Sequence, residues 1–164
     1  MKKSIVTKKG DNGKTYMPAF GNIAKDDIRI EFVGVLDELS SFMGYAKSKI
    51  KDEKIKNILH ELQKDLILVG AELSLQKNNI TAEKVKKIEE YIENLYEKVE
   101  ISPKFELSGK NEKSALIDIC RTIARRLERR LVKLYENDFL KNKQTLAYVN
   151  RISDLLFLMS KSLE

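Results

Sequence analysis

The feature of this sequence that most constrains its fold is a helical spacing of apolar residues that recurs in five separate stretches. In each stretch an apolar residue returns every three or four positions, so that these residues share one face of an α-helix. The predicted helices lie within residues 26–50, 55–73, 81–99, 116–134 and 146–163. Amphipathic helices joined by short connections are typical of a bundle. The sequence therefore predicts an all-α fold, a five-helix bundle.

The ends of some helices carry local signals. Asp26 or Asp27 stands near the start of the first helix, and Thr81 offers an N-cap residue to the third. A break at Ser102-Pro103 follows the third helix, and a linker then runs to Asn111. We expect this linker and the N-terminal residues to be the natural places for a binding loop.

Length and composition fit one soluble domain. The chain has 164 residues, of which 42% are hydrophobic and 34% are charged. No apolar run approaches the roughly 20 residues that a membrane-spanning helix needs, and the N-terminus lacks the apolar region of a signal peptide. A lone cysteine, Cys120, offers no partner for an intrachain disulfide, so we expect a cytoplasmic protein. Cys120 and the single histidine, His60, also make a zinc site or a Cys/His catalytic pair implausible.

Positive charge is concentrated in one kind of side chain. The net charge of +6 favours anionic partners without choosing among nucleotides, nucleic acid and phospholipid. Five of the seven arginines lie within residues 121–130, whereas lysines are spread over the whole chain. Arginine suits forked recognition of phosphate, and Arg121, Arg125 and Arg129 would share one helix face. By itself the pattern fits a polyphosphate clamp, a solvated basic face or a subunit interface.

Two further segments are candidates for binding. Residues 7–15 (TKKGDNGKT) contain glycines three positions apart, which let backbone N–H groups approach an anion. This segment imitates the end of a P-loop but is not a Walker motif, because Lys8 replaces the required upstream glycine. Residues 148–154 (YVNRISD) place polar side chains at helical spacing on the last helix. Taken alone, the first is more often an ordinary turn and the second a polar helix flank.

Taken together and in this order, the motifs resemble those of the PduO-type ATP:cob(I)alamin adenosyltransferases. Residues 7–15 resemble that family's ATP loop, and residues 25–27 (KDD) its continuation. Residues 35–41 (VLDELSS) resemble its V-D-E-L-N/S-S signature. Residues 121–130 resemble its R-x-x-x-R-R-x-E-R signature, and residues 148–154 its N-R-L-S-D element. The resemblance spans nearly the whole chain.

The resemblance implies a ferritin-like five-helix bundle in one domain over 1–164, with an ATP loop over 1–25, assembled as a homotrimer with ATP between subunits. The ATP-binding residues implied in and beside the loop are Thr7, Lys8, Gly10, Asp11, Gly13, Thr15 and Lys25. The residues implied to complete the site are Arg121, Arg125, Arg126, Glu128, Arg129 and Asn150. No side chain is implied as a metal ligand, although Mg²⁺ is expected on the ATP phosphates.

Particular roles are also implied by the resemblance. Asp37 matches an aspartate that forms an intersubunit ion pair with the arginine at the Arg125 position. Phe105 matches a phenylalanine that packs under the corrin and keeps its lower axial ligand away. Phe105, Arg125 and Arg129 are therefore the expected catalytic residues. The family often has L-P-G-G after that phenylalanine, where this chain has Leu-Ser-Gly-Lys at 107–110.

The implied reaction needs no acid/base pair, and the sequence offers no obvious one. Cob(I)alamin is itself a strong nucleophile that attacks the ribose 5′ carbon of ATP and expels triphosphate. The protein must align the two substrates and stabilise charge on the leaving group. We expect a flavin-type reductase and a B12-dependent client enzyme as further partners. We expect no binding to nucleic acid or to a membrane.

Two alternatives remain open from the sequence. A basic helical module could bind nucleic acid, although aromatic residues are few and are not interleaved with the basic positions. Such binding would fall steeply with salt. A non-catalytic ATP sensor or cobalamin carrier could keep the same fold, and analysis of the product separates it from an enzyme.

Overall fold

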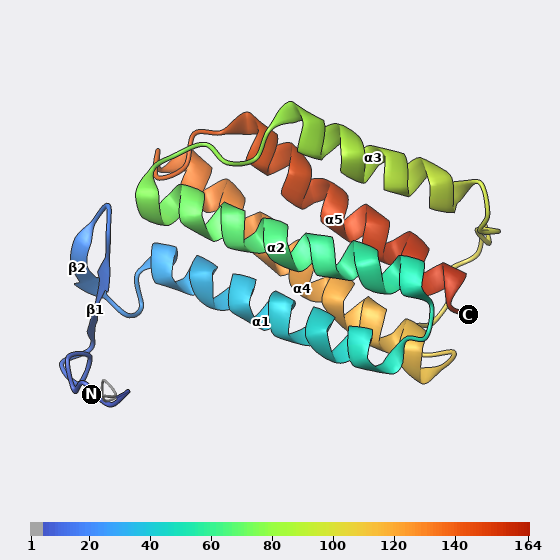
Figure 1. Cartoon of the computed structure of the whole chain (residues 1–164), viewed down its shortest axis with the longest axis horizontal. Helices are drawn as coiled ribbons and strands as arrows, with labels where there is room; N and C mark the ends of the chain where they lie inside the picture. The colour runs from blue at the N-terminus through green and yellow to red at the C-terminus, as the bar shows by residue number, and fades with distance from the viewer. Residues whose placement is uncertain (1–4) are drawn as a thin grey trace.

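A computed structural model describes residues 5–164 and shows five helices preceded by a small hairpin (Figure 1). The elements in chain order are β1 (Lys14–Met17), β2 (Gly21–Ala24), α1 (Ile28–Lys49), α2 (Glu53–Leu75), α3 (Ala82–Tyr96), α4 (Glu112–Glu136) and α5 (Lys143–Ser162). The predicted five-helix bundle is confirmed. The expected N-terminal loop contains an antiparallel pair of strands, in which Lys14 lies opposite Ala24 and Met17 opposite Gly21. No helix among the described residues is both long and apolar enough to cross a bilayer.

Helix boundaries differ from the prediction where side chains cap the backbone. Helix α4 begins earlier than its apolar stripe because Asn111 accepts the backbone N–H groups of Lys113 and Ser114, and the Ser114 hydroxyl accepts that of Asn111. Asp27 is the N-cap of α1, accepting the N–H of Arg29. Thr81 is the N-cap residue of α3, as predicted, although its side chain makes no capping bond.

The core lies between α1, α2, α4 and α5, which run along the long axis of the molecule (Figure 1). Helix α4 packs against both α1 and α5 through a buried stripe from Leu116 to Leu134. The predicted stripe is wrong at Ile119, which is 40% exposed, because Ile117 and Cys120 face the core in that turn instead. Burying a leucine or isoleucine side chain contributes about 1.5–3 kcal/mol. Because this stripe faces inward, the arginines of α4 lie on its outer side.

Helix α3 is attached differently. It packs mainly against α5, and only Val85 and Ile88 of its residues are buried. Long polar side chains join it to α2: Lys84 pairs with Asp65 at 2.5 Å, and the carboxylate of Glu61 accepts bonds from Lys87 and Tyr91. Few apolar contacts therefore hold α3 to its neighbours.

The hairpin docks onto the end of the bundle where α1 begins (Figure 1). The backbone N–H of Ala19, in the turn of the hairpin, donates to the carbonyl of Ser74 near the end of α2 at 3.0 Å. Met17 at the end of β1 is buried in the main core. The hairpin is therefore an attached part of the fold.

A single arginine reinforces this attachment. The Arg29 guanidinium lies 4.5 Å from the ring centroid of Phe20 in the hairpin and 4.6 Å from that of Phe139, between α4 and α5. The two rings meet edge to face at 5.8 Å. The same guanidinium donates two bonds to the carboxylate of Asp27, at 2.7 Å and 2.6 Å. These bonds are the main reason that the pKa of Asp27 is lowered.

A buried carboxylate organises the same end of the bundle. Glu72 in α2 is 3% exposed and accepts backbone N–H bonds from Asn79 and Ile80 in the following connection. It also accepts bonds from the side chains of Asn142 and Thr145 at the start of α5. Four donors satisfy this charge, which fixes the connection after α2 against α5.

Candidate functional site

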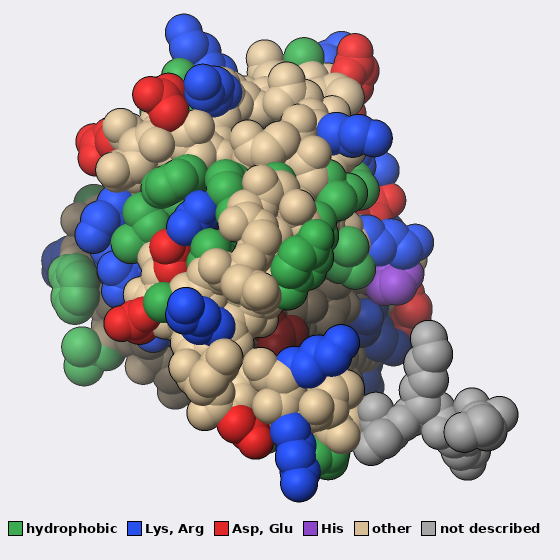
Figure 2. Space-filling model, turned by 90° about the vertical axis from the view of Figure 1, so that its left-hand side faces the viewer, with side chains coloured by type: hydrophobic (Ala, Val, Ile, Leu, Met, Phe, Trp, Pro, Cys, Tyr) green, Lys and Arg blue, Asp and Glu red, His purple; other side chains and the backbone are tan. Residues whose placement is uncertain are grey.

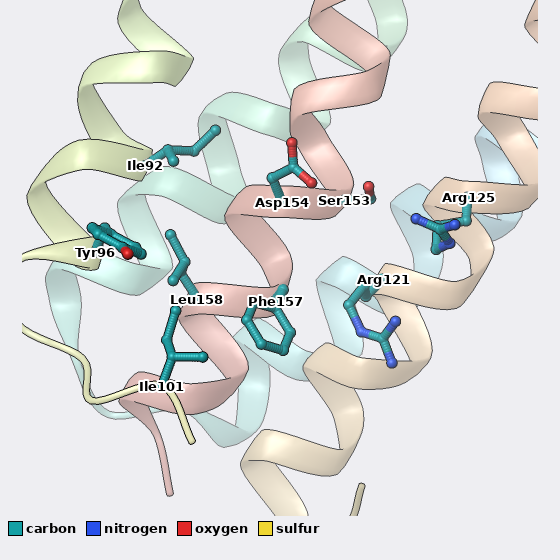
Figure 3. Close-up of a pocket in the computed structure, with 9 residues that line it drawn as sticks. All are labelled: Ile92, Tyr96, Ile101, Arg121, Arg125, Ser153, Asp154, Phe157 and Leu158. Carbon is teal, nitrogen blue, oxygen red and sulfur yellow. The ribbon is translucent and has the colours of Figure 1, made fainter. Parts of the chain in front are cut away.

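A cavity of about 400 Å³ opens between α3, α4 and α5 (Figure 3). It is lined by Ile92, Tyr96, Ile101, Arg121, Arg125, Ser153, Asp154, Phe157 and Leu158. Its volume lies within the range of small-molecule sites, roughly 300–1,000 Å³.

The cavity has two chemically different sides. Figure 3 shows the guanidinium groups of Arg121 and Arg125, one helical turn apart on α4, across from the apolar side chains of α3, α5 and the segment that follows α3. Ser153 and Asp154 lie between these sides, and Phe157 follows one turn later on α5. Such a cavity offers apolar contact to one part of a ligand and cationic donors to another.

A second cavity of about 280 Å³ lies beneath the segment after α3. It shares Ile101, Arg121 and Phe157 with the first, so the two adjoin. Phe105 lines this second cavity, and its side chain is 94% exposed. The structure therefore brings Phe105 to the same region as Arg121 and leaves its ring available for contact.

The arginines of α4 differ in their partners. Arg121 pairs with Asp118 at 2.9 Å, Arg126 pairs with Glu38 of α1, and Arg130 pairs with Glu31 at 3.1 Å. Within residues 5–164 no carboxylate pairs with Arg125 or with Arg129. These two exposed cations therefore remain available to an anionic ligand.

Arg126 has one donor without a partner. Its terminal nitrogen donates to Glu38, but its buried Nε has no hydrogen-bond acceptor among the described residues. Leaving a buried donor unpaired costs about 1–3 kcal/mol. A ligand oxygen that accepted this N–H would remove that cost.

Glu128 and Asn150 are held together between α4 and α5. The Asn150 amide donates to the Glu128 carboxylate, and its oxygen accepts a bond from Arg151 at 2.8 Å. Arg151 in turn donates to Glu89 of α3 at 3.1 Å. This chain of bonds joins three helices beside the first cavity.

The N-terminal loop lies away from these arginines, at the opposite end of the bundle from Phe105 (Figure 1). Gly13 has φ of +75°, which favours glycine. A β-carbon on Gly10 would lie 2.9 Å from the ammonium of Lys25, which crosses the loop. The Lys25 backbone N–H also donates to the Gly13 carbonyl at 2.9 Å. Lys25 and the two glycines thus belong to one compact loop.

The loop also contains Thr7, Lys8, Asp11 and Thr15, of which all but the half-buried Thr15 are exposed. Figure 2 looks onto this end of the molecule and shows Lys and Arg side chains scattered over the face, with acidic and apolar side chains between them. No single continuous basic patch is seen on this face. Recognition of an anion here depends on the shape of the loop as well as on charge.

Asp37 lies on yet another face. It lines a shallow groove of about 190 Å³ between α1 and α2, together with Ile67 and Gly70. Its neighbour Glu38 points instead toward α4, where it meets Arg126. Asp37 and Arg125 therefore open onto different grooves of the same chain.

Cys120 in α4 is fully buried, and burial raises the pKa of its thiol to about 12. A thiol with such a pKa stays protonated and unreactive near neutral pH. The expectation that Cys120 is a packing residue agrees with this environment.

Sequence reasoning missed several residues that the structure brings to the site. Phe157 and Ile101 look like ordinary apolar residues in the sequence, because only the packing of α3 against α5 places them on a cavity wall. Glu38 carried a signal in its position next to Asp37, but its pairing with Arg126 depends on how α1 meets α4.

Comparisons with known proteins identify the family and the fold. Residues 5–163 match the cobalamin adenosyltransferase family. A corrinoid adenosyltransferase from Citrobacter freundii is 35% identical over 96% of this chain and 93% of its own, and one from Bacillus subtilis is 33% identical over 93% and 82%. Among solved structures, a variant of the PduO-type ATP:corrinoid adenosyltransferase from Lactobacillus reuteri, complexed with cobalamin and ATP, superposes with a TM-score of 0.87. It is 31% identical to this chain, and the match covers 98% of this chain and 93% of that one.

Proposed function

The chain belongs to the cobalamin adenosyltransferase family, and we propose that it transfers the 5′-deoxyadenosyl group of ATP to the cobalt of cob(I)alamin, releasing triphosphate. The observation that carries this proposal is the cavity between α3, α4 and α5, which has an apolar side and an arginine side. The apolar side suits a corrin ring, and the arginine side suits the polyphosphate of ATP.

The chemistry follows from the two substrates. The electron pair of cob(I)alamin attacks C5′ of the ribose, the bond from C5′ to the triphosphate oxygen breaks, and its electrons leave with the triphosphate. Negative charge therefore develops on the leaving group. Arg125 and Arg129 have no carboxylate partner within residues 5–164, so their charge is free to stabilise it. Arg126 adds an N–H donor that is already desolvated.

Phe105 has a separate role in the proposal. Its exposed ring lines the cavity next to Phe157 and Arg121, where it can pack against one face of the corrin. Displacing the lower axial ligand leaves a four-coordinate Co(II) that is easier to reduce to Co(I). We expect Phe105→Ala to reduce turnover far more than ATP affinity; equal losses in both would contradict this role.

The ATP site is proposed to form between subunits of a homotrimer. Two features support this. The loop of residues 7–15 and Lys25 precedes the start of α1 and lines no cavity with Arg125, and Asp37 faces a different groove from Arg125. A neighbouring chain would bring a second loop to the arginines and let Asp37 pair with the partner's arginine. In that assembly Glu128 and Asn150 would complete the site beside Arg126.

Mixed oligomers test the shared site. Gly13→Val disables the loop because its φ of +75° excludes a β-branched side chain, and Arg125→Met removes a cation from α4. Each variant alone should be inactive, whereas a mixture refolded together should regain part of the wild-type activity. A mixture that stays inactive, although light scattering shows trimers, would overturn the shared site.

The remaining expectations belong to the same proposal. Mg²⁺ would bind the ATP phosphates, a flavin-type reductase would supply cob(I)alamin, and a B12-dependent enzyme would receive the product. A cytoplasmic location is proposed because the lone cysteine, Cys120, is reduced and buried. The single domain proposed over 1–164 comprises the loop and the bundle.

The direct test of function is an anaerobic incubation with ATP, Mg²⁺ and chemically reduced cobalamin. We expect adenosylcobalamin, measured from the corrinoid spectrum, and an equal amount of triphosphate, measured by a separate triphosphate assay. ATP binding without product would indicate a sensor or carrier, and absence of ATP binding would refute the proposed function.

A further inference from the structure

The segment of residues 99–110 carries Phe105 and joins α3 to α4 without regular secondary structure. Its backbone makes no hydrogen bond to the bundle among the described residues. All the ion pairs and side-chain hydrogen bonds that join it to the bundle involve Glu106 or Lys110. The position of Phe105 therefore depends on the residue next to it.

Four charged side chains form a closed cluster at this point, which we call the Glu106 clasp: Glu106, Lys110, Lys161 and Glu164. The Lys161 ammonium of α5 lies 2.6 Å from the Glu106 carboxylate and 2.9 Å from that of Glu164. The Lys110 ammonium lies 3.2 Å from Glu106 and 2.7 Å from Glu164. Each cation thus contacts both anions.

The clasp lies at the surface, and its members differ in exposure, with the Lys110 side chain the most exposed at 46%. The side chains of Lys161 and Glu164 are each 13% exposed, and that of Glu106 is 31% exposed. Hydrogen bonds from Lys161, and then from Lys110, lower the pKa of Glu106, so its carboxylate is ionised near neutral pH. Isolated surface pairs contribute little, but several charges in one network hold a geometry more firmly.

The clasp also borders the cavity that Phe105 lines. Glu106 and Lys161 both belong to the lining of this cavity, together with Phe105, Phe157 and Arg121. Lys161 lies one helical turn after Phe157 on α5, so the pair it makes with Glu106 draws the segment toward that wall.

We propose that Glu106 is a positioning residue for adenosyl transfer: by pairing with Lys161 and Lys110 it holds the Phe105 segment over the cavity that receives the corrin. This inference rests on the proposed function for the identity of the ligand, but the clasp itself is a property of the ligand-free chain. Glu106 touches no reacting atom and acts through Phe105.

The test compares Glu106→Gln with Glu90→Gln, a matched control that removes one carboxylate from an exposed i,i+4 pair with Lys86 on α3. Loss of both ion pairs of Glu106 should shift the segment equilibrium by about 2–30-fold. We therefore expect backbone NMR order parameters of residues 101–108 to fall in ligand-free Glu106→Gln and to stay unchanged in Glu90→Gln.

Kinetics and spectroscopy supply the functional side of the test. Glu106→Gln should raise KM for cobalamin about 3–10-fold and leave KM for ATP unchanged. With ATP and cob(II)alamin bound, the fraction of four-coordinate Co(II) should fall. Added NaCl should weaken cobalamin binding by the wild-type enzyme and have less effect on Glu106→Gln, because the screened pairs are already absent.

The outcomes separate the two proposals. If the wild-type chain makes no adenosylcobalamin, the proposed function fails, while the backbone order parameters still test the clasp. If the wild-type chain is active and Glu106→Gln matches Glu90→Gln in order parameters, cobalamin KM and Co(II) coordination, the inference about Glu106 is overturned. Equal rises in KM for both substrates would indicate a merely structural role and would also overturn it.

Discussion

The attachment of the N-terminal hairpin through Arg29 gives a quantitative prediction. In Arg29→Met the side chain keeps its length but loses its charge and its planar fork. The guanidinium contacts two rings, those of Phe20 and Phe139, and its side chain is only 13% exposed. A partly desolvated contact of this kind contributes about 0.5–2 kcal/mol. Only the contact with Phe20 joins α1 to the hairpin, because Asp27 and Phe139 stay beside Arg29 when the hairpin undocks; its loss therefore weakens docking by about 0.5–2 kcal/mol.

This energy should appear in the opening of the hairpin. Since 1.4 kcal/mol is a tenfold change in an equilibrium constant, the ratio of docked to undocked hairpin should fall about 2–25-fold in Arg29→Met. ATP affinity should fall less, because apparent affinity decreases only in proportion to the docked fraction. A hairpin that starts about tenfold in favour of docking would lose at most about threefold in ATP affinity.

Hydrogen exchange at one amide measures the docking directly. The Ala19 N–H belongs to the hairpin and its acceptor, the Ser74 carbonyl, belongs to α2, so it exchanges when the hairpin undocks. We expect its protection to fall about 2–25-fold in Arg29→Met, to fall less in Arg29→Lys, and to stay unchanged in Lys56→Met, which removes a cation from an exposed pair on α2. Equal protection in Arg29→Met and Lys56→Met would refute the reasoning.

Three further predictions follow from buried and paired groups. Glu72→Gln should lower the free energy of unfolding by about 2–4 kcal/mol in urea denaturation, since a neutral amide cannot accept all four bonds that the carboxylate accepts; a loss below about 0.5 kcal/mol would contradict this. Because the pKa of Asp27 is lowered in the folded state, its charge stabilises the fold above its unfolded pKa of about 3.9 and stops doing so as pH falls through the folded value. The difference in unfolding free energy between wild type and Asp27→Asn should therefore be full at pH 6 and close below about pH 4, and a difference independent of pH would count against it. Burial raises the pKa of Cys120 to about 12, so iodoacetamide at pH 8 should label it only after unfolding, as mass spectrometry would detect; rapid labelling of the folded chain would show the thiol to be accessible.

The bundle could be predicted from the sequence because the apolar spacing that marks each helix lies within that helix. Each helix carries its own apolar face, and the predicted stripe from Leu116 to Leu134 is buried except at the exposed Ile119. The hairpin could not be predicted with the same ease, since strands of four residues leave too short a pattern. Helix α3 ends at Tyr96, whereas the sequence predicts a helix to residue 99. The prediction is too long because Val99 continues the apolar spacing beyond the last helical turn.

The candidate site divides in the same way. The arginines of α4 stand out by type and spacing, and the structure places Arg121 and Arg125 on a cavity wall. Its apolar wall could not be predicted, since nothing distinguishes Phe157 from a core residue until α3 is placed against α5. The grouping of the loop with Arg125 came from the resemblance to a family, and within one described chain the two lie apart.

The loose attachment of α3 has a mechanical consequence. Its fully buried residues are only Val85 and Ile88, with Tyr91, Ile92 and Leu95 partly buried against the core, and its links to α2 end in flexible charged side chains, so we expect it to open more readily than the other helices. Ile92 and Tyr96 of this helix form part of the cavity wall, facing the rigid side made by α4 and α5. A bulky macrocycle entering this space would push on the yielding side and leave the arginines in register. The cavity thus has one firmly packed wall, which carries the arginines for the phosphates of ATP. The opposite wall, made by α3, is packed less firmly and can adapt to the corrin.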